Sequence, residues 1–367
     1  MFASLPSPLV VMPSRVAQAV WPASMAPRIV IAISGELAAM PWCLRGLLRQ
    51  RTPEGLLPAR GSFGVLLVPL GDAAAARAMV AGMAERLPFP LRLVPPDRPA
   101  GPDAAGWAWR QALLAAADWA GPQGILLATT AETVPAPNWL TAHLTAIGAG
   151  AEAVAGERQR PDAAGRYGAL LRRIAAQLDP QDPCMAGDQA SSLAVTTMAL
   201  AGMPVPADGA NGLLAALRRR DARIDSLRDR LVGAAGTASG PAMERLGPAC
   251  RRWRCRAALR ELWEAGIGSI APETPRLRRW AGRLGLPAGA LAGLLGARHF
   301  GTAWASVEAA SPLLRPRPLP AALLPLETAR ARLLLAWLRL TRPVQRAGGR
   351  AAPGGALGVA MPGICID

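Results

Sequence analysis

One short stretch of the chain combines an apolar run with a single acidic side chain just after it. Residues 124–140 read GILLATTAETVPAPNWL, and Glu132 is the only acid between Thr129 and Thr133. The apolar run is typical of a strand buried on both faces, and open α/β sheets bind ligands where such strands end. A carboxylate there could hold a hard divalent cation. It could equally be the polar residue of a turn or of a helix start, and both interpretations stay open.

Two more acids and one arginine are candidates of the same kind. Glu36 and Asp72 each follow an apolar run and precede a helical pattern, and Arg110 lies within the helical pattern of residues 104–120. Each also has a purely structural explanation. Asp72 would make a good N-cap, Glu36 could face the amino end of its helix, and Arg110 could be a surface arginine rather than a phosphate contact.

Apolar runs alternate with helical patterns along the first two thirds of the chain. We expect strands at residues 28–33, 63–67, 91–94, 125–127, 151–156, 191–195 and 224–232, with helices between them at 37–50, 73–87, 104–120, 139–148, 165–177 and 213–220. This alternation predicts an α/β fold whose mostly parallel sheet is covered by helices on both faces.

The pattern changes near residue 243. From there the sequence predicts only helices with arginine-rich faces, at residues 243–265, 275–284, 288–300, 304–310 and 321–340. We therefore divide the chain into a loose Pro- and Ala-rich lead-in (1–26), a sheet domain (27–243), a helical extension (244–341) and a flexible Gly/Ala/Pro-rich tail (342–367).

The chain is strongly basic, with a formal net charge of +16 over 367 residues. All 41 basic residues are arginines, and they are scattered apart from clusters at residues 218–220, 251–256 and 276–283. No aromatic-interleaved strand motif accompanies them, so we interpret the clusters as solvated helix faces and do not expect a nucleic acid partner. Ligands that carry phosphate groups are compatible with this charge.

Cysteines and histidines support neither a zinc site nor a disulfide framework. The five cysteines include no CxxC pair, and the only histidines are His143 and His299. We expect buried, reduced thiols in a cytoplasmic protein. The longest uncharged run, residues 189–207, contains Pro204 and Pro206 and is a poor candidate for a membrane span.

Six stretches, taken in order, resemble bacterial family 2 glycosyltransferases with the GT-A fold. The resemblance covers residues 28–242 and rests on IAISGELAAMPWCLRGLL (31–48), VPLGDAAAARA (68–78), AGWAWRQAL (105–113), TTAETVPAPNWL (129–140), ASSLAV (190–195) and GANGLL (209–214). It implies a GT-A sheet domain, to which the helical extension is added, and the transfer of a sugar from a nucleotide-diphospho-sugar donor to an acceptor with inversion.

The resemblance also implies roles for individual residues. Glu36 and Asp72 stand where the family holds the nucleoside, Arg110 is retained in the third stretch, and Thr130 replaces the first aspartate of the family's acidic motif. Glu132 stands at the position that binds Mg²⁺ or Mn²⁺ on the diphosphate.

The family's acidic pair near the acceptor is missing, because Ala210 and Asn211 occupy its positions. General-base catalysis needs an ionisable group within hydrogen-bond reach of the acceptor. Asp208, in the same stretch, is the candidate replacement base, with an ordinary loop aspartate as the alternative.

Three functions remain open at this stage. The first is a glycosyltransferase-like protein that binds a nucleotide sugar. The second is a catalytically inactive pseudo-glycosyltransferase that acts as a scaffold and docks partners on its arginine-rich extension. The third is a peripheral binder of anionic membranes, where a lipid-linked acceptor would also lie. All three are compatible with a cytoplasmic location, including the inner face of the membrane.

Overall fold

The computed structural model describes residues 27–94, 104–157, 163–180, 190–206, 209–227, 232–233, 243–264 and 275–341. The predicted lead-in (1–26), the predicted tail (342–367) and Asp208 lie outside the described residues.

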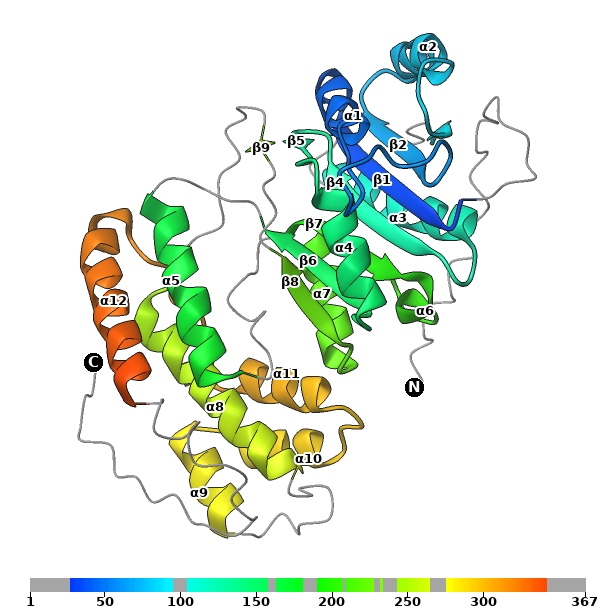
Figure 1. Ribbon diagram of the computed structural model, residues 1–367. Helices are drawn as coiled ribbons and strands as arrows, with labels where there is room; N and C mark the ends of the chain where they lie inside the picture. The colour runs from blue at the N-terminus through cyan, green and yellow to red at the C-terminus, as the bar shows by residue number, and fades with distance from the viewer. Residues whose placement is uncertain are drawn as a thin grey trace, which may run out of the picture. The chain divides into compact units, whose positions relative to one another are not determined.

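The strands form a seven-stranded sheet in the order β3-β2-β1-β4-β7-β6-β8 (Figure 1). β1 pairs in parallel with β2 and β4, β2 pairs in parallel with β3, and β6 does so with β8, whereas β7 is antiparallel to β4. This mixed α/β architecture confirms the predicted, mostly parallel sheet. Its strands are β1 (Ile29–Glu36), β2 (Gly64–Leu70), β3 (Leu91–Leu93), β4 (Ile125–Thr130), β6 (Ala153–Glu157), β7 (Ala190–Thr196) and β8 (Ile224–Leu227), and two short strands, β5 (Thr133–Val134) and β9 (Val232–Gly233), lie outside it.

The helices follow the predicted order, with shifts at some of their ends. Those between the strands are α1 (Met40–Leu48), α2 (Ala73–Ala84), α3 (Ala104–Ala120), α4 (Trp139–Gly148), α5 (Ala163–Leu178), α6 (Thr197–Leu200) and α7 (Gly209–Arg219). After them come α8 (Leu246–Glu264), α9 (Pro275–Arg283), α10 (Ala288–Leu295), α11 (Phe300–Ala310) and α12 (Leu324–Thr341).

By its internal contacts the chain divides into two compact units. The first comprises Met1–Thr141 and Ser192–Gly209, and the second comprises Ala142–Ser191 and Ala210–Asp367. The first unit is therefore discontinuous in sequence, because the chain leaves it after α3 and β4 and returns only with β7. The sequence-based boundary at 243/244 falls within the second unit in this division and stays a prediction.

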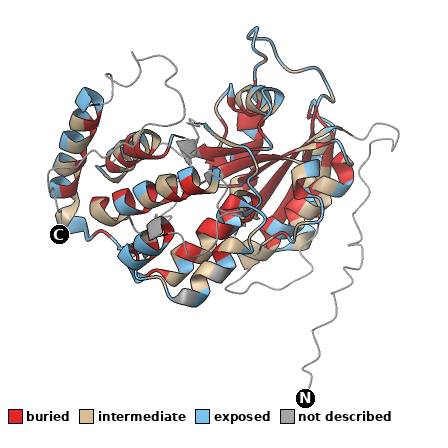
Figure 2. Ribbon diagram, turned by 90° about the horizontal axis from the view of Figure 1, so that it is seen from below, coloured by how far each residue is buried: buried red, intermediate tan, exposed pale blue. Residues whose placement is uncertain are grey.

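The core of the first unit lies along its central strands. Residues Val30, Ile31 and Ile33 of β1 are fully buried, and helix α3 packs on β1, β2 and β4. Figure 2 shows the strands coloured almost throughout as buried. β-Branched and leucine side chains project from both faces of a parallel strand, so continuous apolar runs such as IVIAI form strands that are covered on both sides.

The second unit contains two apolar clusters between helices. One joins α5, α8 and α12 around Tyr167 and Trp253, and the other joins α8, α9, α10 and α11 around Leu259 and Trp304. Helix α8 contributes to both clusters, so it is buried along more than one face. For this reason Arg252 and Arg256 of α8 are only 6% and 3% exposed. The prediction that the arginine clusters lie on solvated faces is wrong for these two residues.

Among the described residues, no helix combines the length and the apolar character that crossing a bilayer requires.

Candidate functional site

The carboxyl ends of β1, β2 and β4 meet at one edge of the sheet. The register pairs Ser34 of β1 with Thr130 of β4, and Glu36 of β1 with Leu70 of β2. The backbone beyond β4 stays attached to β1, because the Ala131 N–H donates to the Ser34 carbonyl oxygen (N···O 2.9 Å). Three of the predicted site residues, Glu36, Thr130 and Glu132, are thereby brought to the same place.

The strand order makes this edge a topological switch point. After β3, at one edge of the sheet, the chain crosses back to form β4 on the other side of β1. The connections that flank β1 and β4 therefore leave in opposite directions, and open α/β sheets bind ligands in the crevice that this reversal creates. Glu132 follows β4 at this point.

The Glu132 carboxylate is directed back toward β1. Its Oε1 accepts a hydrogen bond from the Glu36 backbone N–H (N···O 3.3 Å), and a Cβ added to Gly35 would lie 2.7 Å from the same oxygen. Gly35 also has φ +137°, a backbone conformation that favours glycine. Gly35 is the residue that leaves room for the Glu132 carboxylate.

The other candidates do not take part in that hydrogen bond. Oδ1 of Asp72 accepts from the Ala74 backbone N–H (2.7 Å), so Asp72 caps α2, as its structural explanation anticipated. Arg110 is exposed in the second turn of α3, and Thr130 is exposed at the end of β4. Asp208 lies outside the described residues, so its predicted role stays a prediction.

Gln50, two residues after α1, forms hydrogen bonds with the segment that follows β5. This role was not predicted from the sequence. Its Nε2 donates to the carbonyl oxygens of Gly46 (3.0 Å) and Ala136 (2.7 Å), while its Oε1 accepts from the Leu140 N–H (2.8 Å). The side chain is fully buried. A glutamine at a helix end ordinarily indicates a solvent-exposed residue, so no sequence signal marked it.

Threonine hydroxyls stabilise the turn that carries Glu132. The hydroxyl of Thr133 donates to the Thr130 carbonyl oxygen (2.7 Å), and its oxygen lies 2.7 Å from the hydroxyl oxygen of Thr129. Both threonines are buried. These contacts fix the tight turn between β4 and β5, and with it the position of the acid.

The thiol of Cys43 in α1 lies behind the same turn. Burial raises its pKa to about 12. A hydrogen bond with Thr133 lowers the pKa by less than burial raises it, and the negative charge of nearby Glu132 raises it further. Burial likewise raises the pKa of Cys250 in α8 to about 12. Both thiols are therefore protonated at neutral pH, as expected for structural cysteines.

We expect Cys43 and Cys250 to resist alkylation in the folded protein. At pH 8 a rise of about three pKa units lowers the thiolate fraction on the order of 10³-fold, and burial restricts access further. Brief treatment with iodoacetamide, followed by mass spectrometry of the cysteine peptides, measures this for each residue. Cys255, which is less buried, is the internal comparison and should react faster. Rapid labelling of Cys43 in the folded chain would contradict the burial of its thiol.

Within the part of the chain that the structure describes, no three His, Cys, Asp or Glu side chains are grouped so that they could hold a metal ion. Among these residues, Glu132 is therefore not part of an all-protein cation cage. A single carboxylate does suit Mg²⁺, which commonly takes one or two carboxylates and completes its shell with substrate phosphates and water.

No protein-family model matches this chain, and no curated protein matches it in sequence. The chain is similar in structure to glucosyl-3-phosphoglycerate synthase from Mycobacterium tuberculosis, solved in complex with Mn²⁺, UDP and glucosyl-3-phosphoglycerate. The TM-score is 0.37 at 19% identity, over 66% of this chain and 85% of the other. It is also similar to S. aureus TarS, with a TM-score of 0.38 at 15% identity over 87% and 91% of the two chains. These scores are too low to assign a family or an activity to this chain.

Proposed function

We propose that this chain is a glycosyltransferase-like protein of family 2 that binds a nucleotide-diphospho-sugar at the carboxyl edge of β1, β2 and β4. The observation that carries the proposal is the coincidence of Glu36, Thr130 and Glu132 at the topological switch point of the sheet. The sequence resemblance supports the ligand class, and the strand register supports the proposed location.

In this proposal the exposed side chains at the edge bind the donor. Glu36 and Asp72, after two adjacent parallel strands, accept hydrogen bonds from the nucleoside, and Arg110 and Thr130 contact the diphosphate. Asp72 can do so while it caps α2, because a carboxylate has lone pairs on both oxygens and the cap uses one of them.

Glu132 would hold Mg²⁺ or Mn²⁺ jointly with the diphosphate. Its Oε1 is engaged by the Glu36 N–H, and the other carboxylate oxygen supplies the charge and the lone pairs that a hard cation needs. When bound, the cation offsets the charge that develops on the leaving diphosphate. Asp208 remains the proposed base for the acceptor hydroxyl, and the acceptor itself is unassigned.

The second candidate is a catalytically inactive pseudo-glycosyltransferase that serves as a scaffold. One specific observation favours it, namely that two acids at the donor-binding positions have structural partners within the chain. Glu132 accepts from the backbone of Glu36, and Asp72 accepts from the backbone of Ala74. Selection on the fold alone would retain both acids.

Isothermal titration of the full chain with a panel of UDP-, GDP- and TDP-sugars, with and without Mn²⁺, separates the two candidates. We expect one donor to bind with Kd in the range of about 1 μM to 1 mM, as is usual for enzyme substrates, and Mn²⁺ to strengthen that binding. Glu132→Gln should abolish the effect of Mn²⁺. Its amide oxygen can still accept from the Glu36 N–H, so the turn keeps its shape.

Glu85→Gln is the matched control, because Glu85 is an exposed acid just after α2 and away from the strand ends. It should bind like the wild type in both conditions. If none of the sugars binds and Glu132→Gln behaves as the wild type does, the donor-binding proposal is wrong and the scaffold takes its place.

A further inference from the structure

Helices α7, α8 and α11 of the second unit line a half-open cavity of about 240 Å³. The lining side chains of α8 and of α11 are four residues apart and share a helix face, whereas α7 contributes two consecutive arginines at its end. The charged and polar lining comprises Arg218 and Arg219 of α7, Arg252 and Arg256 of α8, and Trp304 and Glu308 of α11. Four arginines and one glutamate therefore line a common space.

The junction of α7 with α11 is built closely enough to fix this geometry. Asp221, just after α7, accepts at Oδ2 from the Phe300 N–H (2.8 Å) and at Oδ1 from the Gly301 N–H (2.7 Å). It therefore caps α11 with a carboxylate, which the positive end of the helix dipole stabilises. Arg218 and Arg219 are held beside the first turns of α11 as a result.

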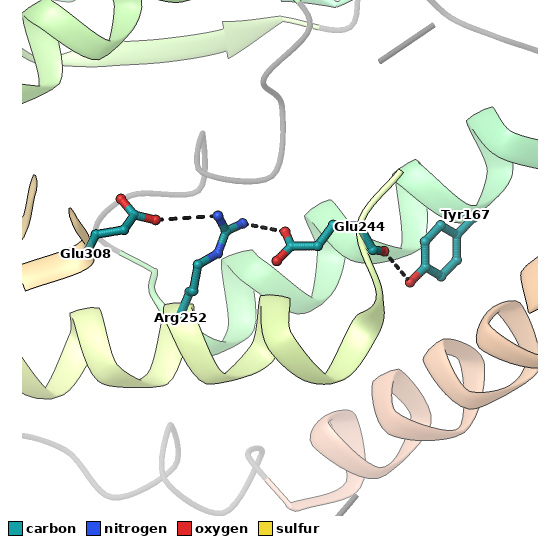
Figure 3. A network of polar contacts seen from close by, with 4 residues as sticks. All are labelled: Tyr167, Glu244, Arg252 and Glu308. Carbon is teal, nitrogen blue, oxygen red and sulfur yellow. Dashed lines mark hydrogen bonds and ion pairs between the residues drawn. The ribbon is translucent and has the colours of Figure 1, made fainter. Parts of the chain in front are cut away.

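Acidic side chains flank two of the cavity arginines. Arg252 lies between two carboxylates, pairing through Nη2 with Glu244 and through Nη1 with Glu308 at 3.4 Å (Figure 3). The Nε of Arg256 is 3.9 Å from Oδ2 of buried Asp179. Glu244 and Asp179 do not belong to the lining, which contains four arginines and one acid, Glu308.

Two buried donors near this wall have no hydrogen-bond acceptor among the described residues. They are the indole Nε1 of Trp304 and the Nε of Arg252, whose side chains are both more than nine-tenths buried. A buried donor without an acceptor is unfavourable, and an oxyanion in the cavity would offer acceptors to both.

We propose that this cavity binds a small anion through a phosphate group. Phosphate presents several acceptor oxygens and up to two negative charges at neutral pH, which matches guanidinium groups that converge from two helices. The volume is below the ~300–1,000 Å³ typical of pockets for drug-sized ligands, so an inorganic phosphate, a diphosphate or a compact phosphomonoester fits best. This site is separate from the sheet-edge site, and the proposal does not depend on donor binding there.

Titration of the full chain with inorganic phosphate, pyrophosphate and glycerol 3-phosphate tests the proposal and distinguishes the sources of the phosphate group. We expect at least one of these to bind with Kd below about 1 mM in 0.15 M NaCl, a salt concentration that screens unspecific surface attraction. Arg219→Ala should weaken that binding at least tenfold. Arg219 is exposed at the last position of α7, so its replacement leaves the packing of the helix intact.

Arg220→Ala is the matched control, since it removes the same charge from the next residue, which does not line the cavity. It should weaken binding less than twofold. A second readout is the indole ¹H–¹⁵N resonance of Trp304, assigned by its loss in Trp304→Phe, which should shift on addition of the bound anion. Equal losses in the two arginine variants, an unmoved Trp304 resonance, or no binding of any of the three anions would each overturn the proposal.

Discussion

Replacing Gly301 with alanine should destabilise the second unit by about 3–5 kcal/mol. A Cβ at this position would lie 1.7 Å from the carbonyl oxygen of Arg218 and 2.8 Å from the Cα of Arg219. Both are backbone atoms, so no side-chain rotation relieves the overlap and α11 has to move away from α7. That movement also breaks the two hydrogen bonds from the α11 amides to the Asp221 carboxylate.

Gly293→Ala is the matched control for this prediction. Gly293 is an exposed glycine inside α10 of the same unit, and a Cβ there would meet nothing within 4 Å. Since alanine favours a helix over glycine, this variant should gain up to about 1 kcal/mol. Urea unfolding followed by circular dichroism measures both changes. A Gly301→Ala protein as stable as the wild type would refute the close contact between the two helices.

Gln50→Glu should lower the free energy of unfolding of the first unit by about 3 kcal/mol or more at pH 7. The carboxylate cannot donate to the carbonyl oxygens of Gly46 and Ala136, and it would place a negative charge beside them in a fully buried position. Only the bond from the Leu140 N–H would remain. The segment that connects β5 to α4 would therefore loosen from the end of α1.

The pH dependence gives a second measurement on the same variant. Burial raises the folded-state pKa of the introduced carboxyl above its unfolded value of about 4.3. A carboxyl group whose pKa is raised by folding makes its full contribution to stability at pH values below its unfolded-state pKa. That contribution is lost as the pH rises through its folded-state pKa. The loss in free energy of unfolding of Gln50→Glu, relative to the wild type, should thus become smaller as the pH falls from 7 to 4. Gln123→Glu, at an exposed glutamine of the same unit, should show no such deficit.

The strands of the fold could be predicted because their signals are local. The runs that became β1 and β4 are continuous stretches of β-branched and leucine residues, and such stretches have few alternatives to a buried strand. The strand expected at residues 28–33 continues to Glu36 in β1. Its pairing with β2 extends to Glu36 opposite Leu70, a contact with a distant part of the chain.

Helix starts were predicted less well where distant residues determine them. Helix α11 begins at Phe300 rather than at residue 304, because Asp221, far away in the sequence, caps it. Helix α7 begins at Gly209, which has φ +69°, rather than at residue 213, where the sequence predicted its start. Both starts depend on backbone contacts or conformations that no periodicity reveals.

The candidate sites show the same limit. The acid at the end of β4 could be found from its place after an apolar run, but the room for its carboxylate comes from Gly35, on a different strand. The arginines of the cavity occur in two clusters that the sequence suggested were solvated. Arg252 and Arg256 are buried because α8 packs into two apolar clusters at once, which is a property of the tertiary arrangement alone.

The return of the chain to the first unit through β7 bears on how the protein is synthesised. β4 is complete at Thr130, but its antiparallel neighbour spans Ala190–Thr196. At ~5–20 residues per second, a ribosome needs several seconds to produce the intervening chain. During that interval the outer edge of an apolar strand has unpaired N–H and C=O groups, the kind of edge that recruits other chains. The nascent protein therefore has an aggregation-prone strand edge between the completion of β4 and the emergence of β7.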